Sequence, residues 1–537
     1  MISENSSMAK GEIVTLGGPS TEAGVERPPP EIAIDPNEKH LGTDHLLSDL
    51  KGRTISGAFI TIAAQGAQFV LSLVSIMVLA RLLTPKDFGL FAMVTTVIGY
   101  LRVFKDAGLS TATVQREGIT HAQVSNLFWI NVVMSGAIGL ILATCAPVVA
   151  WFYREPRLVP ITLILSSTFL LSGLTIQHTA LLNRQMRFKA VAFIEVGSML
   201  TGVAVGIGMA LLGYNYWALV WANLATVAVA VPLTWLAIPW RPQAPTRRSG
   251  IRPLVSFGVN LTTGGFIYAL ARGADAMLIG RFYGPDSTGL YTRAGALLRR
   301  PMEQFLSPMN SVFVPVLSRV QAQPDRYRRT FLQVYEAMAL ISFLGTGILF
   351  ALARPLTLVV LGPKWEQAAI IFAGFTVGAL VTPLATASTW LFASQGRGKD
   401  WLLTSSLLST IALASFIAGL PFGPAGVAIV ASGVGLLIGM PVLYYLAGRK
   451  GPVTTADLWA GIFRYLPLWV VVSGATYGTR LLFANSAPLI QLLVCAPVGL
   501  IAGMTLIWVL TPMRRVALSL IDILRELKSR SALFNRR

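Results

Sequence analysis

Residues 81–91 read RLLTPKDFGLF and residues 281–291 read RFYGPDSTGLY, so that arginine, proline, glycine and leucine coincide at an offset of 200 positions (281 − 81). Each stretch follows an apolar segment, which makes it the first outer turn of a block of spans. We expect six spans in each block, an even number, so both blocks enter the bilayer from the same side. The repeat therefore predicts two lobes related by an axis along the membrane normal, with a substrate path between them.

The composition is typical of a membrane protein. Hydrophobic residues make up 54% and charged residues 12% of the 537 residues, whereas about 25% of the residues are charged in soluble domains. Apolar segments of roughly 20–28 residues, long enough to cross a bilayer core of ~30 Å as helices, recur along the chain. They lie near residues 55–80, 88–104, 126–152, 158–182, 190–212, 216–238, 254–280, 288–318, 331–353, 367–393, 401–420, 424–447, 460–480 and 487–511. The sequence predicts an all-α integral membrane fold of about 14 transmembrane helices, in two duplicated six-helix lobes plus two C-terminal helices.

The regions outside the lobes differ in composition. The first fifty residues are acidic, contain consecutive prolines and lack an apolar run, which is typical of a disordered tail. The last residues combine apolar positions at helical spacing with bases, which predicts an amphipathic helix on an anionic inner leaflet. The predicted division is an acidic cytoplasmic tail at 1–50, an N-terminal six-helix lobe at 51–240, a basic cytoplasmic linker at 241–252, a C-terminal six-helix lobe at 253–447, transmembrane helices 13 and 14 at 448–511, and a basic amphipathic cytoplasmic tail at 512–537.

The loops between the spans also predict orientation. Lysine and arginine are about twice as frequent in the loops on the side of the amino terminus as in the loops on the other side, and such an excess marks the cytoplasmic face. We therefore expect both termini to be cytoplasmic. The formal net charge is +19, which could suggest a nucleic-acid partner. The bases are dispersed over short loops and form no basic stripe, so we expect no nucleic-acid partner.

Several charged residues fall inside predicted spans, where each costs about 2.5–3.5 kcal/mol at the helix centre. They are Arg102, Glu195, Arg272, Asp275, Arg293, Arg299, Arg300 and Glu303. One interpretation is local ion pairing, of Arg272 with Asp275 and of Arg300 with Glu303. That interpretation leaves the other arginines without partners nearby in the sequence. These unpaired arginines predict an aqueous, electropositive cavity. Because guanidinium groups bind phosphate bidentately and stay charged, an anionic substrate, particularly a diphosphate, would suit it.

Three further residues are singled out by their position. Pro301, in the eighth span, predicts a break in the helical hydrogen bonding. Asp275 and Glu195 are candidates for ion coupling, and the alternative is that they are only salt-bridge partners. No residues at metal-ligand spacing and no cofactor motif occur, so we expect neither a metal nor a cofactor.

Three stretches resemble a known family: residues 81–90, the sequence DAGL at 106–109 and the sequence GYNYWALV at 213–220. They are similar to those of the polysaccharide transporter (Wzx-like) flippases of the multidrug/oligosaccharidyl-lipid/polysaccharide (MOP) superfamily, over about residues 50 to 510. The resemblance implies two six-helix lobes around a central cavity and alternating access, coupled to an ion gradient. Cavity arginines would hold the diphosphate; we assign Arg272, Arg293 and Arg299 to this role by their spans.

The same resemblance implies a substrate and a location. The substrate would be an undecaprenyl-diphosphate-linked oligosaccharide, moved across the bacterial inner membrane for the biosynthesis of lipopolysaccharide or other surface polysaccharide and exopolysaccharide. The implied partners are this lipid-linked substrate, membrane lipids, and a polysaccharide polymerase with other assembly proteins.

Two other classes of protein are considered. An ion-coupled drug or metabolite antiporter of the same superfamily would favour acidic groups in its cavity, whereas bases predominate here. A membrane-bound enzyme of polysaccharide assembly would need a catalytic constellation. The chain has no Asp-x-Asp pair, no large outer loop, no paired-histidine spacing and no complete phosphate-binding loop, so we expect a transporter and not an enzyme.

Overall fold

The structure is a computed structural model that describes Asn37, Leu41 and residues 50–106, 108–116, 118–246 and 252–534. Over these residues it contains helices and no β-strand, so the all-α prediction is confirmed. Nearly all of the predicted acidic tail and part of the predicted basic linker (247–251) lie outside the described residues.

The N-terminal half is built from eight described helices. They are α2 (Leu50–Leu82), α3 (Pro85–Asp106), α4 (Leu109–Gln115), α5 (His121–Thr144), α6 (Ala146–Tyr153), α7 (Leu158–Arg184), α8 (Phe188–Leu211) and α9 (Trp217–Ala237). Local sequence defines the start of α5: the Thr120 hydroxyl accepts from the Gln123 N–H, and the Gln123 side chain accepts from the Thr120 N–H. This reciprocal pair satisfies two N–H groups that have no partner within a helix.

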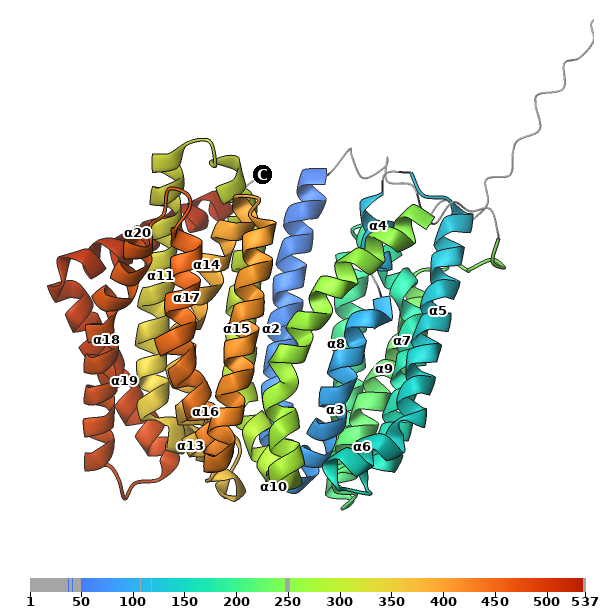
Figure 1. Ribbon diagram of the computed structural model, residues 1–537, viewed down its shortest axis with the longest axis horizontal. Coiled ribbons are helices and arrows are strands. Elements are labelled where there is room, and N and C mark those ends of the chain that lie inside the picture. Colours follow the sequence, from blue (N-terminus) through green and yellow to red (C-terminus); the bar gives the residue numbers. More distant parts are fainter. Residues whose placement is uncertain are drawn as a thin grey trace, which may run out of the picture.

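The C-terminal half begins with one long helical element, α10. Its helices are α10 (Arg252–Arg319), α11 (Pro324–Ala351), α12 (Ala353–Val360), α13 (Ala368–Ala379), α14 (Thr382–Ser394), α15 (Gly398–Gly419), α16 (Gly423–Val434), α17 (Met440–Gly448), α18 (Thr455–Leu482), α19 (Pro488–Val509) and α20 (Thr511–Phe534), with short helices η2 (Pro363–Trp365), η3 (Leu420–Phe422) and η4 (Gly435–Gly439). Figure 1 shows α20 lying across the ends of the neighbouring helices. That α20 rests on the membrane surface stays a prediction.

Helix α10 is folded at Gly284. This residue has φ 75° and ψ −172°, a conformation that only glycine adopts readily. The backbone stays helical through Pro301, although proline has no N–H to donate, so the hydrogen bonding is interrupted there without a bend into a non-helical conformation. Proline is tolerated within membrane helices because neighbouring groups and small local adjustments satisfy the freed carbonyl.

Figure 1 shows α3 to α9 gathered on one side and α11 to α20 on the other, with α2 and α10 between them. Each side has its own hydrophobic core, around Phe128 on one side and around Tyr335 and Trp390 on the other. A third core joins the two sides and includes Phe88 and Trp365. Burial of one such large side chain contributes about 1.5–3 kcal/mol, so the junction is part of the stable fold.

Ten helical stretches among the described residues are long and apolar enough to cross a membrane. They are Phe59–Leu82, His121–Thr144, Leu158–Arg184, Phe188–Leu211, Trp217–Ala237, Pro324–Ala351, Ala368–Ser394, Gly398–Gly448, Thr455–Leu482 and Pro488–Val509. Helices α3 and α10 are not in this set, and α15 to α17 count as one stretch. The chain is therefore a multi-pass membrane protein, and the number of fourteen crossings stays a prediction.

Candidate functional site

Asp275 is the centre of a polar cluster on the folded helix α10. Its side chain is buried, and its Oδ2 accepts a hydrogen bond of 2.9 Å from the Tyr291 hydroxyl. The same oxygen lies 3.4 Å from the Arg299 Nη2. In a straight helix, two residues 24 positions apart would be separated by about 36 Å. The fold at Gly284 therefore brings this carboxylate and this guanidinium together.

The ion pair that the structure shows at Asp275 was not predicted, and the predicted pair of Arg272 with Asp275 stays a prediction. Sequence spacing suggested Arg272 as the partner of Asp275, and left Arg299 without one. The structure pairs Asp275 with Arg299, and the side chain of Arg272 lies outside the described residues. The local prediction missed this pair because helical spacing detects only neighbours three or four residues apart.

Arg299 lies where two cavities meet. The first, of about 430 Å³, is lined by Asp275, Tyr291, Arg299 and Phe375 together with mainly apolar side chains. The second, of about 1100 Å³, is lined by Arg299 and by residues of α10, α14 and α15. The Arg299 guanidinium carbon lies 5.6 Å from the centre of the Phe375 ring, a cation–π distance. With its side chain 43% exposed, this arginine can contact a ligand while it remains paired.

The larger cavity is lined by hydroxyl, amide and indole groups, by the carboxylate of Glu303 and by apolar side chains. Its polar and aromatic lining residues include Asn310, Thr382, Thr386, Thr389, Trp390 and Trp401. The Trp390 N–H donates to the Asn310 side-chain oxygen at 2.5 Å, which holds both side chains in place. Sequence reasoning did not select these residues, because none is charged. The sequence feature that could have indicated them is the spacing of Thr382, Thr386 and Thr389, which places these three hydroxyls on one face of a helix.

Two other predicted arginines lie between the halves. The Arg293 guanidinium carbon stands 4.5 Å from the centre of the Phe88 ring, and its Nε is buried without a hydrogen-bond partner among the described residues. Arg300 donates to the Ser72 hydroxyl of α2 at 3.2 Å. Both arginines therefore connect α10 to the N-terminal half, and the Arg300–Glu303 pair stays a prediction.

Two predicted residues lie apart from these cavities. Arg102 is exposed on α3, and it lines neither cavity. Glu195 is exposed on α8, where it accepts a hydrogen bond of 2.8 Å from the Gln68 side chain of α2. The structure thus gathers Asp275 and Arg299 in one site but does not bring Glu195 into it.

The two halves are joined at one end of the molecule. The Trp365 indole N–H donates to the Ala80 carbonyl at 2.8 Å, and its ring meets the Phe88 ring edge-on at 5.3 Å. Arg81 donates to the Val359 carbonyl at 3.0 Å. These contacts join the turn at 81–91, which opened the sequence repeat, directly to the C-terminal half.

Charged groups that line cavities inside a multi-pass helical membrane protein are typical of the class of transport proteins. The comparison with protein families identifies it further. A family model described as "Polysaccharide biosynthesis protein" matches residues 78–370. The chain belongs to this family, which confirms the resemblance predicted from the sequence. A relative from Rhizobium meliloti that is 25% identical over 364 residues, 66% of this chain and 72% of that protein, is named the succinoglycan biosynthesis transport protein ExoT, which agrees with the expectation of a transporter.

Two curated relatives and one solved structure illustrate the similarity. The teichuronic acid biosynthesis protein TuaB of Bacillus subtilis is 26% identical over 415 residues, 75% of this chain and 83% of that protein. The lipopolysaccharide biosynthesis protein WzxC of Escherichia coli is 23% identical over 324 residues, 59% of this chain and 65% of that protein. The fold is that of the lipid II flippase MurJ in an inward closed conformation, with a TM-score of 0.63, 13% identity, and coverage of 84% of this chain and 98% of that one.

Proposed function

We propose that this chain flips an undecaprenyl-diphosphate-linked oligosaccharide from the cytoplasmic to the periplasmic leaflet of a bacterial inner membrane, for surface polysaccharide or exopolysaccharide biosynthesis. The observation that carries the proposal is the position of Arg299, which lines both a mainly apolar cavity and a larger cavity with hydroxyl and indole groups. A lipid-linked glycan has the same sequence of chemistries: an isoprenoid, a diphosphate and sugars.

Each part of this substrate has a matching group in the site. A guanidinium group binds phosphate oxygens through charge-assisted hydrogen bonds, and Arg299 is half exposed for this purpose. Threonine hydroxyls and tryptophan rings in the larger cavity can hydrogen-bond and stack on a sugar. The proposed substrate-binding set is Arg102, Arg272, Asp275, Arg293, Arg299 and Arg300, with Asp275 and Glu195 as candidates for ion coupling.

Movement of the substrate requires the two halves to move relative to each other. We take the lobes as residues 51–240 and 253–447, with the last two transmembrane helices at 448–511 outside the duplication. The contacts of Trp365 with Ala80 and Phe88 join the halves at one end, and in alternating access these contacts would separate. Both termini would be cytoplasmic, and a polysaccharide polymerase and other assembly proteins would act with the flippase.

The main alternative is an ion-coupled antiporter for drugs or metabolites. A cavity for organic cations needs a carboxylate with free charge. Of the two carboxylates that line the cavities, Glu303 takes part in another interaction. Asp275 is buried and contacts Arg299 and Tyr291, so that the more exposed charge of this pair is positive. This arrangement favours an anionic substrate.

The proposal is tested by flipping in proteoliposomes. The substrate is an undecaprenyl diphosphate that carries a fluorescent oligosaccharide, and a membrane-impermeant quencher reports the leaflet in which it lies. We expect Arg299→Gln to slow flipping at least tenfold, because loss of a charge-assisted hydrogen bond of about 1.5–3 kcal/mol corresponds to a factor of ten or more. The control is Arg354→Gln, which breaks an exposed ion pair with Glu366 away from the cavities. Flipping of the Arg299 variant at the wild-type rate would refute the role of this arginine.

A further inference from the structure

The turn between α7 and α8 and the turn between α14 and α15 share one sequence pattern. Residues 185–189 read QMRFK and residues 395–399 read QGRGK. Their backbones agree as well: Arg187 has φ −82° and ψ 54°, and Arg397 has φ −85° and ψ 50°. In each turn the arginine N–H donates at 2.9 Å to the carbonyl five positions earlier (187 − 182 and 397 − 392). The two turns are therefore structural equivalents in the two halves.

In the C-terminal turn the arginine side chain is hydrogen-bonded to other groups of the protein. Arg397 donates through Nε to Asp400 at 3.0 Å, and through its terminal nitrogens to the carbonyls of Leu446 at 2.6 Å and Ala447 at 2.9 Å. Only 10% of its side chain is exposed. Asp400 also pairs with Lys450 at 3.2 Å. In this copy of the pattern the arginine is therefore an internal clamp whose charge is paired with Asp400.

In the N-terminal turn the compensating carboxylate is missing. The position three residues after the arginine is Ala190 in this turn and Asp400 in the other. Arg187 and Lys189 are both exposed, and neither has a hydrogen-bond or ion-pair partner among the described residues. The same local sequence and backbone therefore present two free cations in one half of the molecule.

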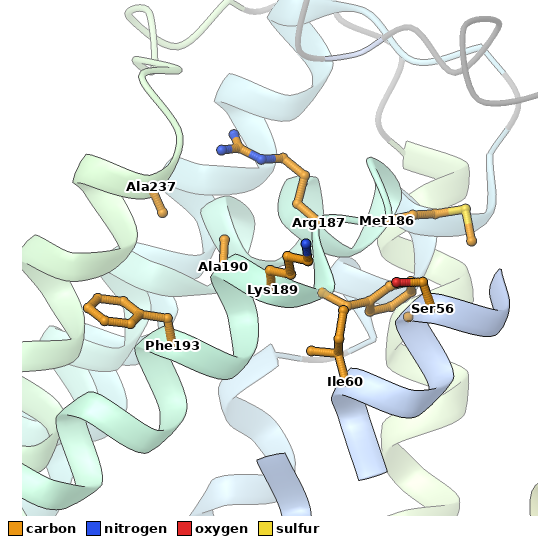
Figure 2. A pocket seen from close by; sticks show the side chains of 10 residues that line it. Ser56, Ile60, Met186, Arg187, Lys189, Ala190, Phe193 and Ala237 are labelled. Atoms are coloured by element: carbon orange, nitrogen blue, oxygen red, sulfur yellow. The ribbon is translucent and has the colours of Figure 1, made fainter. Parts of the chain in front are cut away.

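These cations line a cavity of about 670 Å³ between α2 and α8. Figure 2 shows Lys189 near Ile60 of α2 and Phe193 further along α8, whereas the Arg187 side chain extends away from α2 at the same end of the cavity. The wall is tight, because a Cβ placed on the α2 glycine Gly57 would overlap the Phe188 ring. The cavity therefore combines a cationic end with an apolar side.

The apolar side continues onto the surface that faces lipid. Phe59 of α2 and Phe193 of α8 are 74% and 68% exposed. The candidate span Phe188–Leu211 begins directly at the cation pair. A lipid could therefore place its phosphate head group at these cations and its hydrocarbon chain along the apolar side. Lysine and arginine near the ends of spans attract anionic head groups.

We propose that Arg187 and Lys189 dock the diphosphate head group of the lipid-linked substrate at the surface of the N-terminal half, before the lipid reaches Arg299. Two cations match a diphosphate better than the single charge of a bulk phospholipid. The inference rests on the proposed function only in the identity of the lipid. The site itself follows from the free charges, the cavity and the exposed apolar wall.

The test measures lipid binding to the full chain in nanodiscs. The probes are undecaprenyl diphosphate, phosphatidylglycerol and inorganic pyrophosphate. The first variant is Ala190→Asp, which introduces at the partly buried Ala190 the carboxylate that the other turn already has, and so pairs the charge of Arg187 while Arg187 and Lys189 themselves stay in place. The double variant Arg187→Gln/Lys189→Gln removes both charges. The matched control is Lys399→Gln, the exposed equivalent of Lys189 in the C-terminal turn.

We expect undecaprenyl diphosphate to bind Ala190→Asp and the double variant about tenfold more weakly than wild type, the loss expected for one charge-assisted hydrogen bond, and Lys399→Gln to bind like wild type. Equal affinity in all variants would overturn the inference, as would an equal loss for phosphatidylglycerol or tight binding of free pyrophosphate alone. If wild type itself does not bind undecaprenyl diphosphate, the proposed function fails as well. The two failures are therefore distinguishable.

Discussion

Gly89 and Gly289 occupy equivalent positions in the two copies of the repeated turn, and each packs against the backbone of the other copy. A Cβ on Gly89 would overlap the carbonyl oxygen of Pro285, and a Cβ on Gly289 would overlap the carbonyl oxygen of Pro85. The contact is reciprocal, as expected for two related units that meet at an axis between them. The glycine and proline that match in the sequence are therefore the residues that touch across the junction.

This contact predicts the effect of a single methyl group. Gly89→Ala should destabilise the junction by about 1–3 kcal/mol, the usual cost of overpacking, because both contact partners are backbone atoms that cannot rotate away. Thermal unfolding in detergent measures the effect. The control is Gly99→Ala in the same helix, where a Cβ would meet nothing within 4 Å. If both alanine variants unfold at the same temperature, the junction is not closely packed in solution.

The hydrogen bond between Tyr291 and Asp275 predicts a second effect. Tyr291→Phe removes a donor from an almost buried carboxylate, and we expect a loss of about 1.5–3 kcal/mol, the range for hydrogen bonds to charged groups. The free energy of unfolding in detergent measures it. Tyr445→Phe is the comparison, because Tyr445 is 62% exposed. A stability of the Tyr291 variant equal to that of Tyr445→Phe would show that the cluster does not hold the two arms of α10 together.

The hydroxyl-lined cavity predicts a selective effect on the glycan. Thr386→Val keeps the side-chain shape and removes a hydroxyl that lines the larger cavity. We expect flipping of the oligosaccharide-linked lipid to fall about three- to tenfold, as for one neutral hydrogen bond, while binding of undecaprenyl diphosphate without sugar stays unchanged. Thr410→Val is the control, because Thr410 makes the same hydrogen bond to the carbonyl four residues earlier, at 3.0 Å against 2.9 Å, but lies on an exposed face. Equal rates for both variants would exclude this cavity as the sugar site.

The loop between α6 and α7 predicts a dependence on pH. Both oxygens of Glu155 accept hydrogen bonds of 2.8 Å from Arg157. These bonds hold the pKa of Glu155 below its usual value of 4.5. The pair therefore stabilises the fold above that pH and loses its effect as the pH falls through the lower folded-state pKa.

We expect Glu155→Gln to lower the melting temperature at pH 6, and the difference to disappear once the pH falls below the lowered pKa of Glu155. The effect should be within about 1 kcal/mol, since Arg157 is partly exposed and water screens the pair. Melting curves of both proteins across this range measure it. A difference that persists on acidification would contradict the ion pair.

Much of the fold could be predicted from residues close together in the chain. The apolar segments predict the helices, because each turn of a helix is stabilised within itself. The matching turns at 81–91 and 281–291 predict the duplication, because the same local contacts require glycine and proline in both copies. That the backbone stays helical through Pro301 could not be predicted, since the groups that compensate for a proline come from elsewhere in the fold.

The site could be predicted only in part. The charges of Asp275 and Arg299 were visible as costly residues within apolar spans, but their pairing depends on the fold at Gly284. Phe375 and Thr386 could not be selected, because neutral residues show no such cost and reach the site from other helices. The sequence repeat therefore indicated where a site would lie, and packing decided which side chains line it.

The repeated turn and the QxRxK pattern illustrate which features the sequence predicts and which depend on the tertiary structure. By itself the sequence determined a helical membrane protein and predicted two related halves and an excess of arginine within the spans, because hydrophobicity and helical periodicity are local properties. Only the tertiary structure decided that Arg397 is compensated by Asp400 and the α17 carbonyls, whereas Arg187 faces a cavity beside α2. The physical reason is that a charge is compensated by what surrounds it in space, and those groups come from distant parts of the chain.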